Sequence, residues 1–213
     1  MGPQSAPANG TRQVAIDAAA AAQLAWYFQS DIGVLAPRGW HCLELAGSAG
    51  TQLYVFPGPL SADQMLRPGF KGLKGPAIQL SFIDGGTSGR FNAAHLIARL
   101  FPQERRFVDG VIAEGGEPAS GFPSGPYPDD QLTRRGSNIV EYMTPAGKKG
   151  LGYDSWLVPG GDPVTGVVIL PGDADHDVVH LAIRLPQALR GAAPAIIRQV
   201  EADHPAASSA PAR

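Results

Sequence analysis

The sequence has one cysteine, Cys42, among 213 residues, so it can form neither an intrachain disulfide nor a zinc site built from several cysteines. It has no apolar run of about 18 residues, the length that a membrane-spanning helix needs. Charged residues are scarce, at 17% of the chain, and the net charge is −2. The chain thus lacks the positive charge with which nucleic-acid-binding proteins hold phosphate groups. We expect neither a membrane span nor a nucleic-acid partner.

Glycine and proline are abundant instead, with 27 and 20 residues, nearly twice their usual combined share of about 12%. So many helix breakers exclude a coiled coil or a simple helical bundle. The length favours one domain with its own core, which we place at residues 13–204. Residues 205–213 are low in complexity and have no apolar group to bury, so we expect a disordered tail. Residues 1–12 are expected to form a disordered leader.

The composition of the leader bears on the cellular compartment. Residues 1–10 contain no basic segment followed by an apolar one, so we expect no signal peptide within this sequence. Their Ala, Pro and Ser content resembles the leader that often follows a cleaved signal in bacteria of high GC content. A single thiol is compatible with export and with the cytosol. We expect a periplasmic or secreted protein, with a cytoplasmic location as the alternative.

Alternating apolar and polar residues predict β-strands, which we place at residues 40–46, 52–56, 77–83, 138–144, 163–170 and 177–185. Helices are predicted at residues 14–29, from a cap at Thr87 or Ser88 to Pro102, around Val108 and Val111, and after Pro186. Short turns between consecutive strands favour antiparallel pairing. The predicted class is α+β: an antiparallel sheet of about six or seven strands covered by N-terminal, central and C-terminal helices. Gln79 and Ser81 alternate with apolar residues, which predicts a half-buried strand.

The lone thiol is one candidate for chemistry. Cys42 becomes a nucleophile if a histidine base, here His180, approaches it in the fold. The order of Cys before His along the chain resembles that of bacterial cell-wall cysteine peptidases. Those enzymes place the cysteine at the start of a helix, where the helix dipole lowers its pKa, whereas Cys42 lies in a strand pattern typical of a small core residue. We therefore predict no catalytic residue, with Cys42 and His180 as the alternative.

A second candidate is a metal site at Asp173, Asp175, His176 and His180, because carboxylates and imidazoles within a few residues suit zinc or calcium. The spacing matches no calcium loop, since the mid-loop glycine and the closing glutamate are missing. A polar turn with solvated charges is the favoured interpretation, and the metal site is the alternative. The glycine-rich turn at residues 85–89 has no phosphate-loop lysine or dinucleotide fingerprint, so we expect no cofactor.

Arg38, Trp40 and His41 are the candidate binding residues, because an amphipathic ring beside hydrogen-bond donors suits a ligand groove. Residues 36–40, Ala-Pro-Arg-Gly-Trp, resemble the entry to the first hairpin of the PsbP-like superfamily, which includes photosystem II extrinsic proteins and many bacterial lipoproteins. The order of elements over residues 32–203 is similar too. The stretch 34–42 also resembles uncharacterised proteobacterial exported proteins. The resemblance implies an accessory or binding role rather than catalysis.

We therefore expect a non-enzymatic accessory or binding protein of the bacterial cell envelope. Its partner, a protein or a small molecule, would contact a surface near the first hairpin and the loop at residues 117–130. The alternative is a hydrolase of the cysteine peptidase or amidase type, with Cys42 as the nucleophile and His180 as the base.

Overall fold

The structure is a computed structural model that describes residues 16, 18–172 and 174–205. The strands are β1 (Leu24–Gln29), β2 (Ile32–Pro37), β3 (His41–Gly47), β4 (Gly50–Phe56), β5 (Ala77–Ile83), β6 (Gln131–Arg135), β7 (Ile139–Thr144), β8 (Val164–Ile169) and β9 (Val178–Arg184). The α-helices are α1 (Ala18–Gln23), α2 (Ala62–Leu66), α3 (Arg90–Leu100), α4 (Arg105–Ala113) and α5 (Ala193–Asp203). The predicted leader and tail lie almost entirely outside the described residues.

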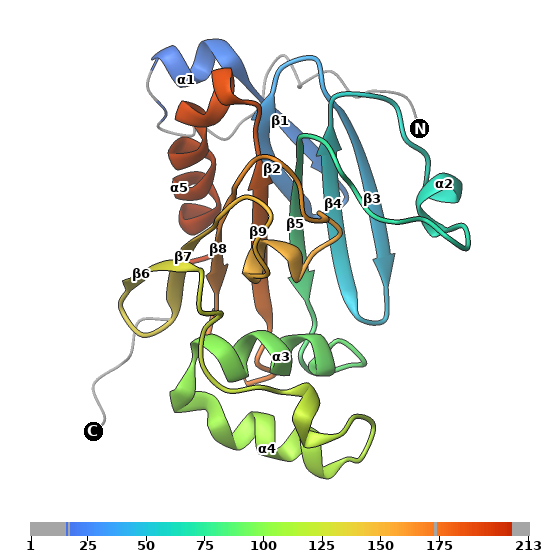
Figure 1. Ribbon diagram of the computed structural model, residues 1–213, viewed down its shortest axis with the longest axis vertical. Helices are drawn as coiled ribbons and strands as arrows, with labels where there is room; N and C mark the ends of the chain where they lie inside the picture. Colours follow the sequence, from blue (N-terminus) through green and yellow to red (C-terminus); the bar gives the residue numbers. More distant parts are fainter. Residues whose placement is uncertain (1–15, 17, 173, 206–213) are drawn as a thin grey trace.

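A seven-stranded antiparallel sheet, in the order β3-β4-β5-β9-β8-β7-β6, forms the centre of the fold (Figure 1). Strands β1 and β2 pair beside it as a separate hairpin. With helices at the N-terminal, central and C-terminal positions, the α+β class is confirmed. In the described part of the chain, no helix is both long and apolar enough to cross a bilayer.

The first predicted helix is wrong beyond Gln23, where the chain turns into β1. The alanines favour a helix, but Trp26, Tyr27 and Phe28 fit a pleated surface better. They pair with β2 across a tight turn in which Ser30 has a φ of 45°. Tertiary pairing therefore overrides the helical propensity of the preceding alanines.

Three further differences concern polar segments. Strand β6 was not predicted, because it is mostly exposed and shows no apolar alternation. Helix α2 lies in a segment for which no helix or strand was predicted, and a capping box between Ser61 and Gln64 begins it. The cap at Thr87 or Ser88 is wrong, since α3 begins after Gly89 without a side-chain cap.

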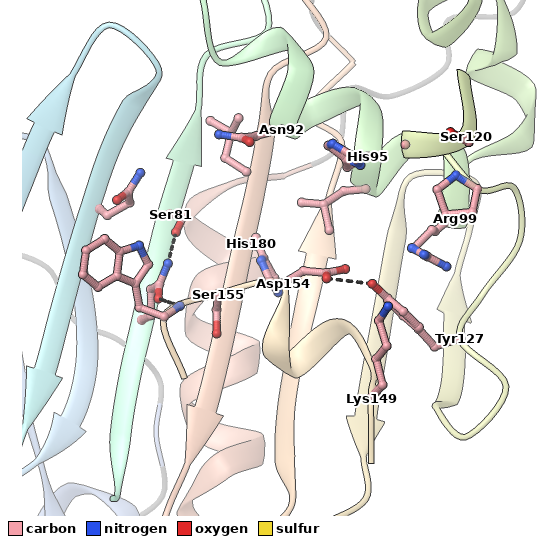
Figure 2. Close-up of a pocket in the computed structure, with 17 residues that line it drawn as sticks. Ser81, Asn92, His95, Arg99, Ser120, Tyr127, Lys149, Asp154, Ser155 and His180 are labelled. Atoms are coloured by element: carbon pink, nitrogen blue, oxygen red, sulfur yellow. Dashed lines mark hydrogen bonds between the residues drawn. The ribbon is translucent and has the colours of Figure 1, made fainter. Parts of the chain in front are cut away.

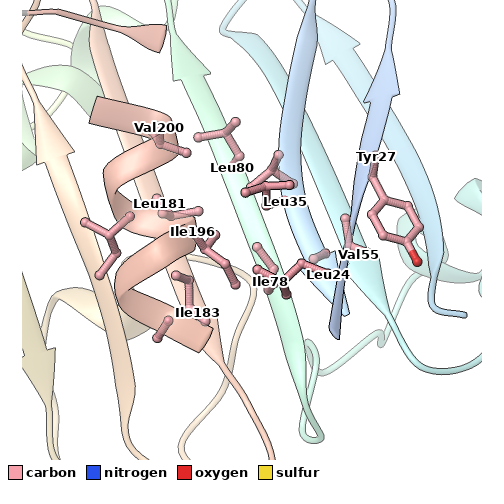
Figure 3. Packing of buried hydrophobic residues seen from close by; sticks show 14 of the residues in the cluster. Leu24, Tyr27, Leu35, Val55, Ile78, Leu80, Leu181, Ile183, Ile196 and Val200 are labelled. Carbon is pink, nitrogen blue, oxygen red and sulfur yellow. The ribbon is translucent and has the colours of Figure 1, made fainter. Parts of the chain in front are cut away.

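One face of the sheet is covered by α5 and by the β1–β2 hairpin. Figure 3 shows Ile196 and Val200 of α5 beside Leu181 and Leu80 of the sheet, with Leu35 of the hairpin on the other side. All of these side chains belong to one buried apolar cluster. This face is therefore a conventional hydrophobic core, whose burial drives folding.

The opposite face is covered by α3 and the loops at residues 57–76, 114–130 and 145–163, and α4 packs against α3 (Figure 1). Its central strands carry polar side chains, and the prediction that β5 is half-buried is wrong. Gln79 and Ser81 are each only 4% exposed, and His180 of β9 is 2% exposed. The side of β5 that the sequence assigned to solvent is thus enclosed by protein.

Arg184 fastens two of these loops to the sheet. It is 1% exposed, and its guanidinium donates to the carbonyl oxygens of Gly75 at 2.9 Å, of Val158 at 2.5 Å, and of Leu73. The backbone of Leu73 also bonds to Trp156 and Val158. Because each of these buried groups is satisfied, residues 154–158 are held in a fixed position over the sheet.

Candidate functional site

A cavity of about 610 Å³ opens on the polar face of the sheet, between α3 and the two loops that Figure 2 shows around it. Its floor comes from three neighbouring strands, which contribute Gln52, Gln79, Ser81, Ile83 and His180. Its walls come from α3, with Asn92, His95, Leu96 and Arg99, from residues 120–127, and from residues 149–156. The volume lies within the usual range of small-molecule sites, about 300–1,000 Å³.

The floor follows directly from strand register. Gln52 of β4 lies opposite Ser81 of β5, and Ser81 lies opposite His180 of β9. Side chains directly opposite each other point to the same face of a sheet, with Cβ atoms about 4.5–5.5 Å apart. The three polar side chains therefore form one row across the sheet, on the side away from the α5 core.

His180 is held in this row by Tyr142 of β7. The Tyr142 hydroxyl lies 2.9 Å from Nε2 of His180 and donates to the carbonyl oxygen of Leu181 at 3.0 Å. A phenol has one proton to donate. Since Leu181 accepts it, Nε2 of His180 must carry the imidazole proton and donate to Tyr142. Nδ1 of the neutral ring therefore keeps its lone pair.

A glycine makes this contact sterically possible. Gly166 of β8 lies opposite Tyr142 and separates it from β9. A Cβ at position 166 would lie 1.8 Å from the carbonyl oxygen of Leu181 and 2.8 Å from the Tyr142 hydroxyl. The absent side chain therefore leaves the space across which the tyrosine reaches His180.

Burial lowers the pKa of His180 to about 4, because the charged imidazolium loses its hydration. The ring is therefore neutral near pH 7. Among the described residues, no group donates a hydrogen bond to its Nδ1. His180 thus provides a neutral acceptor at the floor of the cavity.

Gln79 orients Ser81 beside this acceptor. The Gln79 amide accepts from the backbone N–H of Trp156 at 2.7 Å and donates to the Ser81 hydroxyl at 2.9 Å. The Ser81 oxygen therefore acts as an acceptor toward Gln79, and its own proton has no acceptor among the described residues. A donor and an acceptor from two buried residues, Ser81 O–H and His180 Nδ1, thus occupy opposite positions of two paired strands at the floor of the cavity.

The far wall of the cavity is charged. Tyr127 donates to Oδ1 of Asp154 at 2.8 Å, and the guanidinium carbon of Arg99 lies 3.6 Å from the centre of the Tyr127 ring. The ammonium group of Lys149 lies 5.8 Å from the same ring centre. Desolvation raises the pKa of Asp154 although its carboxyl is open to the cavity. Desolvation and the neighbouring Asp154 also raise the pKa of Tyr127, which keeps it a donor.

The loop that carries Lys149 and Asp154 is anchored locally by Asp130. Its carboxylate accepts from the Thr144 hydroxyl at 2.6 Å and from the backbone of Leu151 at 2.9 Å. Thr144 in turn accepts from the backbone of Gly152 at 3.0 Å. These bonds fix both ends of the 145–152 turn beside the cavity.

His95 closes the wall that α3 provides. Its ring stacks on Phe122 with centroids 4.6 Å apart, and its Nε2 lies 3.0 Å from Glu117. The loop at residues 117–130 is thereby fixed to α3. This is the loop that the sequence assigned to binding, and Ser120 and Tyr127 from it line the cavity.

The structure does not bring Cys42 and His180 together. Cys42 lies in β3, is 6% exposed, and belongs to the apolar cluster on the α5 side of the sheet. Its row runs through Val55 and Ile78 to Ile183, whereas His180 points to the opposite face. Because the sheet separates them, the two side chains form no dyad, and Cys42 packs in the core.

Arg38, Trp40 and His41 do not converge on one surface. Trp40 is 9% exposed and packs in the core cluster with its backbone N–H bonded to Tyr27. Its neighbour His41 points to the other face of β3, as successive strand residues do. Arg38 is exposed and donates to the carbonyl oxygen of Ala21 at 2.9 Å. None of the three lines the cavity of Figure 2.

The residues of the alternative metal site are also separated. Asp175 is exposed, His176 stacks on Phe107 and lies 3.2 Å from Glu104, and His180 lies on the sheet. Asp173 lies outside the described residues. Within residues 16, 18–172 and 174–205, no group of three His, Cys, Asp or Glu residues is arranged to hold a metal.

Comparison of the chain with protein-family models, with curated proteins and with solved structures gives no match.

Gly166→Ala tests whether the absence of a side chain at position 166 is needed for the contact between Tyr142 and His180. We expect a loss of about 1–3 kcal/mol in the free energy of unfolding, because the new methyl group must displace the Leu181 carbonyl and the Tyr142 ring. Urea denaturation measures it. Gly161→Ala is the matched control, since a Cβ there meets nothing within 4 Å. Equal stability of the two variants would contradict the contact.

The lowered pKa of His180 predicts a pH dependence of stability. Between pH 7 and pH 5 the unfolded chain takes up a proton at position 180 and the folded chain does not, so stability is lost as pH falls. Wild type should lose about 1.5–2 kcal/mol more over this interval than His180→Gln, which cannot titrate. Denaturation curves at both pH values measure the difference. Parallel losses in the two proteins would show that folded His180 protonates at its ordinary pKa.

Proposed function

We propose that this protein binds a small, polar, hydroxyl-bearing molecule in the cavity and carries out no covalent chemistry there. The observation that supports the proposal is the pair formed by the Ser81 hydroxyl and Nδ1 of His180. Both side chains are more than nine-tenths buried, both line the cavity, and neither satisfies the other.

A ligand hydroxyl fits this pair because it is both a donor and an acceptor. Its oxygen accepts the Ser81 proton, and its own proton goes to Nδ1 of His180. Leaving a buried polar group unpaired costs about 1–3 kcal/mol. A ligand that forms a hydrogen bond to each group removes this cost and therefore binds more tightly. Water can occupy the same position, and a well-placed hydroxyl replaces its hydrogen bonds.

The geometry favours binding over hydrolysis. A serine nucleophile needs a hydrogen bond to its base, and the base needs an orienting acid. In the described residues Ser81 makes no hydrogen bond to His180, and Asp154 accepts from Tyr127. The second ring nitrogen of His180 bonds to a tyrosine rather than to a carboxylate. The groups are therefore arranged as hydrogen-bonding partners for a ligand.

The cellular location belongs to the same proposal. The Ala, Pro and Ser content of residues 1–10 supports a bacterial envelope protein, and a binding role for small molecules is compatible with that location. The resemblance to the PsbP-like superfamily also supports an accessory or binding role. Both remain predictions.

A variant that fills the cavity mouth tests the proposal. Asn92 is exposed on α3 and lines the cavity, so Asn92→Trp should block access without changing the core. Ligand-observed NMR with acidic, neutral and basic sets of hydroxylated small molecules should give hits for wild type, and Asn92→Trp should lose them. Arg106→Trp, on the exposed side of α4, controls for a new surface tryptophan and should keep them.

Two results would contradict this proposal. One is that no compound of any set binds wild type at millimolar concentration. The other is that the hits bind Asn92→Trp as well as they bind wild type, because the cavity is then not where they bind.

A further inference from the structure

We infer that the ligand is a hydroxylated carboxylic acid with one negative charge, whose carboxylate lies against Arg99 and Lys149 while a hydroxyl lies between Ser81 and His180. This inference rests on the proposed function and adds the charge class of the ligand. It depends on how the polar groups are distributed along the cavity.

The two kinds of group lie at different ends. Figure 2 shows Ser81 toward one side of the cavity, His180 and Asp154 in the middle, and Arg99 with Lys149 on the other side. An extended ligand that fills this space therefore meets neutral hydrogen-bonding groups at one end and positive charge at the other.

The positive charge is not neutralised by ion pairs. Among the described residues, neither Arg99 nor Lys149 forms a salt bridge with a carboxylate. Arg99 instead lies over the Tyr127 ring and donates to the carbonyl oxygen of Gly125 at 3.3 Å. Two cations beside one ring repel each other, and an anion between them removes that cost.

The carboxylates near this end favour a monoanion over a more highly charged ligand. Asp154 accepts from Tyr127, and the charges of Asp154 and Asp130 both lie close enough to raise the pKa of Tyr127. Arg99 and Lys149 form no salt bridge with these carboxylates, so a single ligand carboxylate can pair with both cations. A phosphate monoester carries about −1.5 to −2 at pH 7 and would bring surplus negative charge beside Asp154.

Lys149 offers a matched control in its neighbour. Lys149 lines the cavity, whereas Lys148 pairs with Asp129 at 3.7 Å and does not line it. Both are exposed, so replacing either by glutamine removes one surface charge at little cost in stability. Only the substitution at 149 changes the charge of the site.

Calorimetric titration with three acids and three matched neutral compounds tests the inference. The pairs are D-glucuronate with D-glucose, D-galacturonate with D-galactose, and D-gluconate with sorbitol. At least one acid should bind wild type about tenfold or more tightly than its neutral partner, as loss of a charge-assisted hydrogen bond implies. Lys149→Gln should weaken the binding of that acid at least about threefold, with less effect on the binding of the neutral compound. Lys148→Gln should bind like wild type.

The outcomes separate the inference from the proposed function. If neutral or basic compounds bind in the cavity and no acid binds better than its neutral partner, the charge class is wrong and the binding function stands. The same holds if D-glucose 6-phosphate binds more tightly than D-glucuronate. Equal weakening by Lys149→Gln and Lys148→Gln also contradicts the inference. If nothing binds here or in the wider screen, both proposals fail.

Discussion

The hydrogen bond between the Tyr142 hydroxyl and Nε2 of His180 is the contact on which the polarity of the cavity floor depends. It fixes which ring nitrogen carries the proton, and it keeps the other nitrogen as an acceptor on the floor. Gly166 leaves the space for this contact. Burial then keeps the ring neutral. Without the tyrosine, a neutral imidazole could place its proton on either nitrogen, and the floor would have no defined polarity.

The two faces of the sheet differ in what they bury. On one face α5 and the β1–β2 hairpin bury an apolar cluster that contains Cys42. On the other face, helices and loops enclose a row of polar side chains instead of a uniformly apolar layer. Buried polar groups reduce stability unless they are paired. Leaving Ser81 and His180 incompletely paired is the kind of local cost that proteins concentrate at functional sites.

Most of the sheet could be predicted from the sequence, because strands such as residues 77–83 and 177–185 alternate strongly and short turns join several of them. Strand β1 could not, since local alanine propensity conflicts with a pairing that only the fold reveals. The site could not be predicted from the sequence for a related reason. Alternation alone assigned Gln79 and Ser81 to solvent, and it cannot show that distant loops cover that face.

Some signals for the site were nevertheless in the sequence. Polar residues at alternate positions of two strongly apolar strands, with His180 among them, indicate a face that is not simply packed. The loop at residues 117–130 was assigned to binding, and it does line the cavity. Lys149 and Asp154 gave no signal, because their positions depend on how Asp130 and Arg184 anchor a loop.

Neutron diffraction from deuterium-exchanged crystals tests the polarity of the floor most directly, because it locates the exchangeable protons. We expect a deuteron on Nε2 of His180 directed at Tyr142, none on Nδ1, and an oxygen atom of water or ligand within hydrogen-bond distance of both Nδ1 and the Ser81 hydroxyl. A deuteron on Nδ1, or a Ser81 hydroxyl that donates its deuteron to a protein group, would contradict the structure of the site described above.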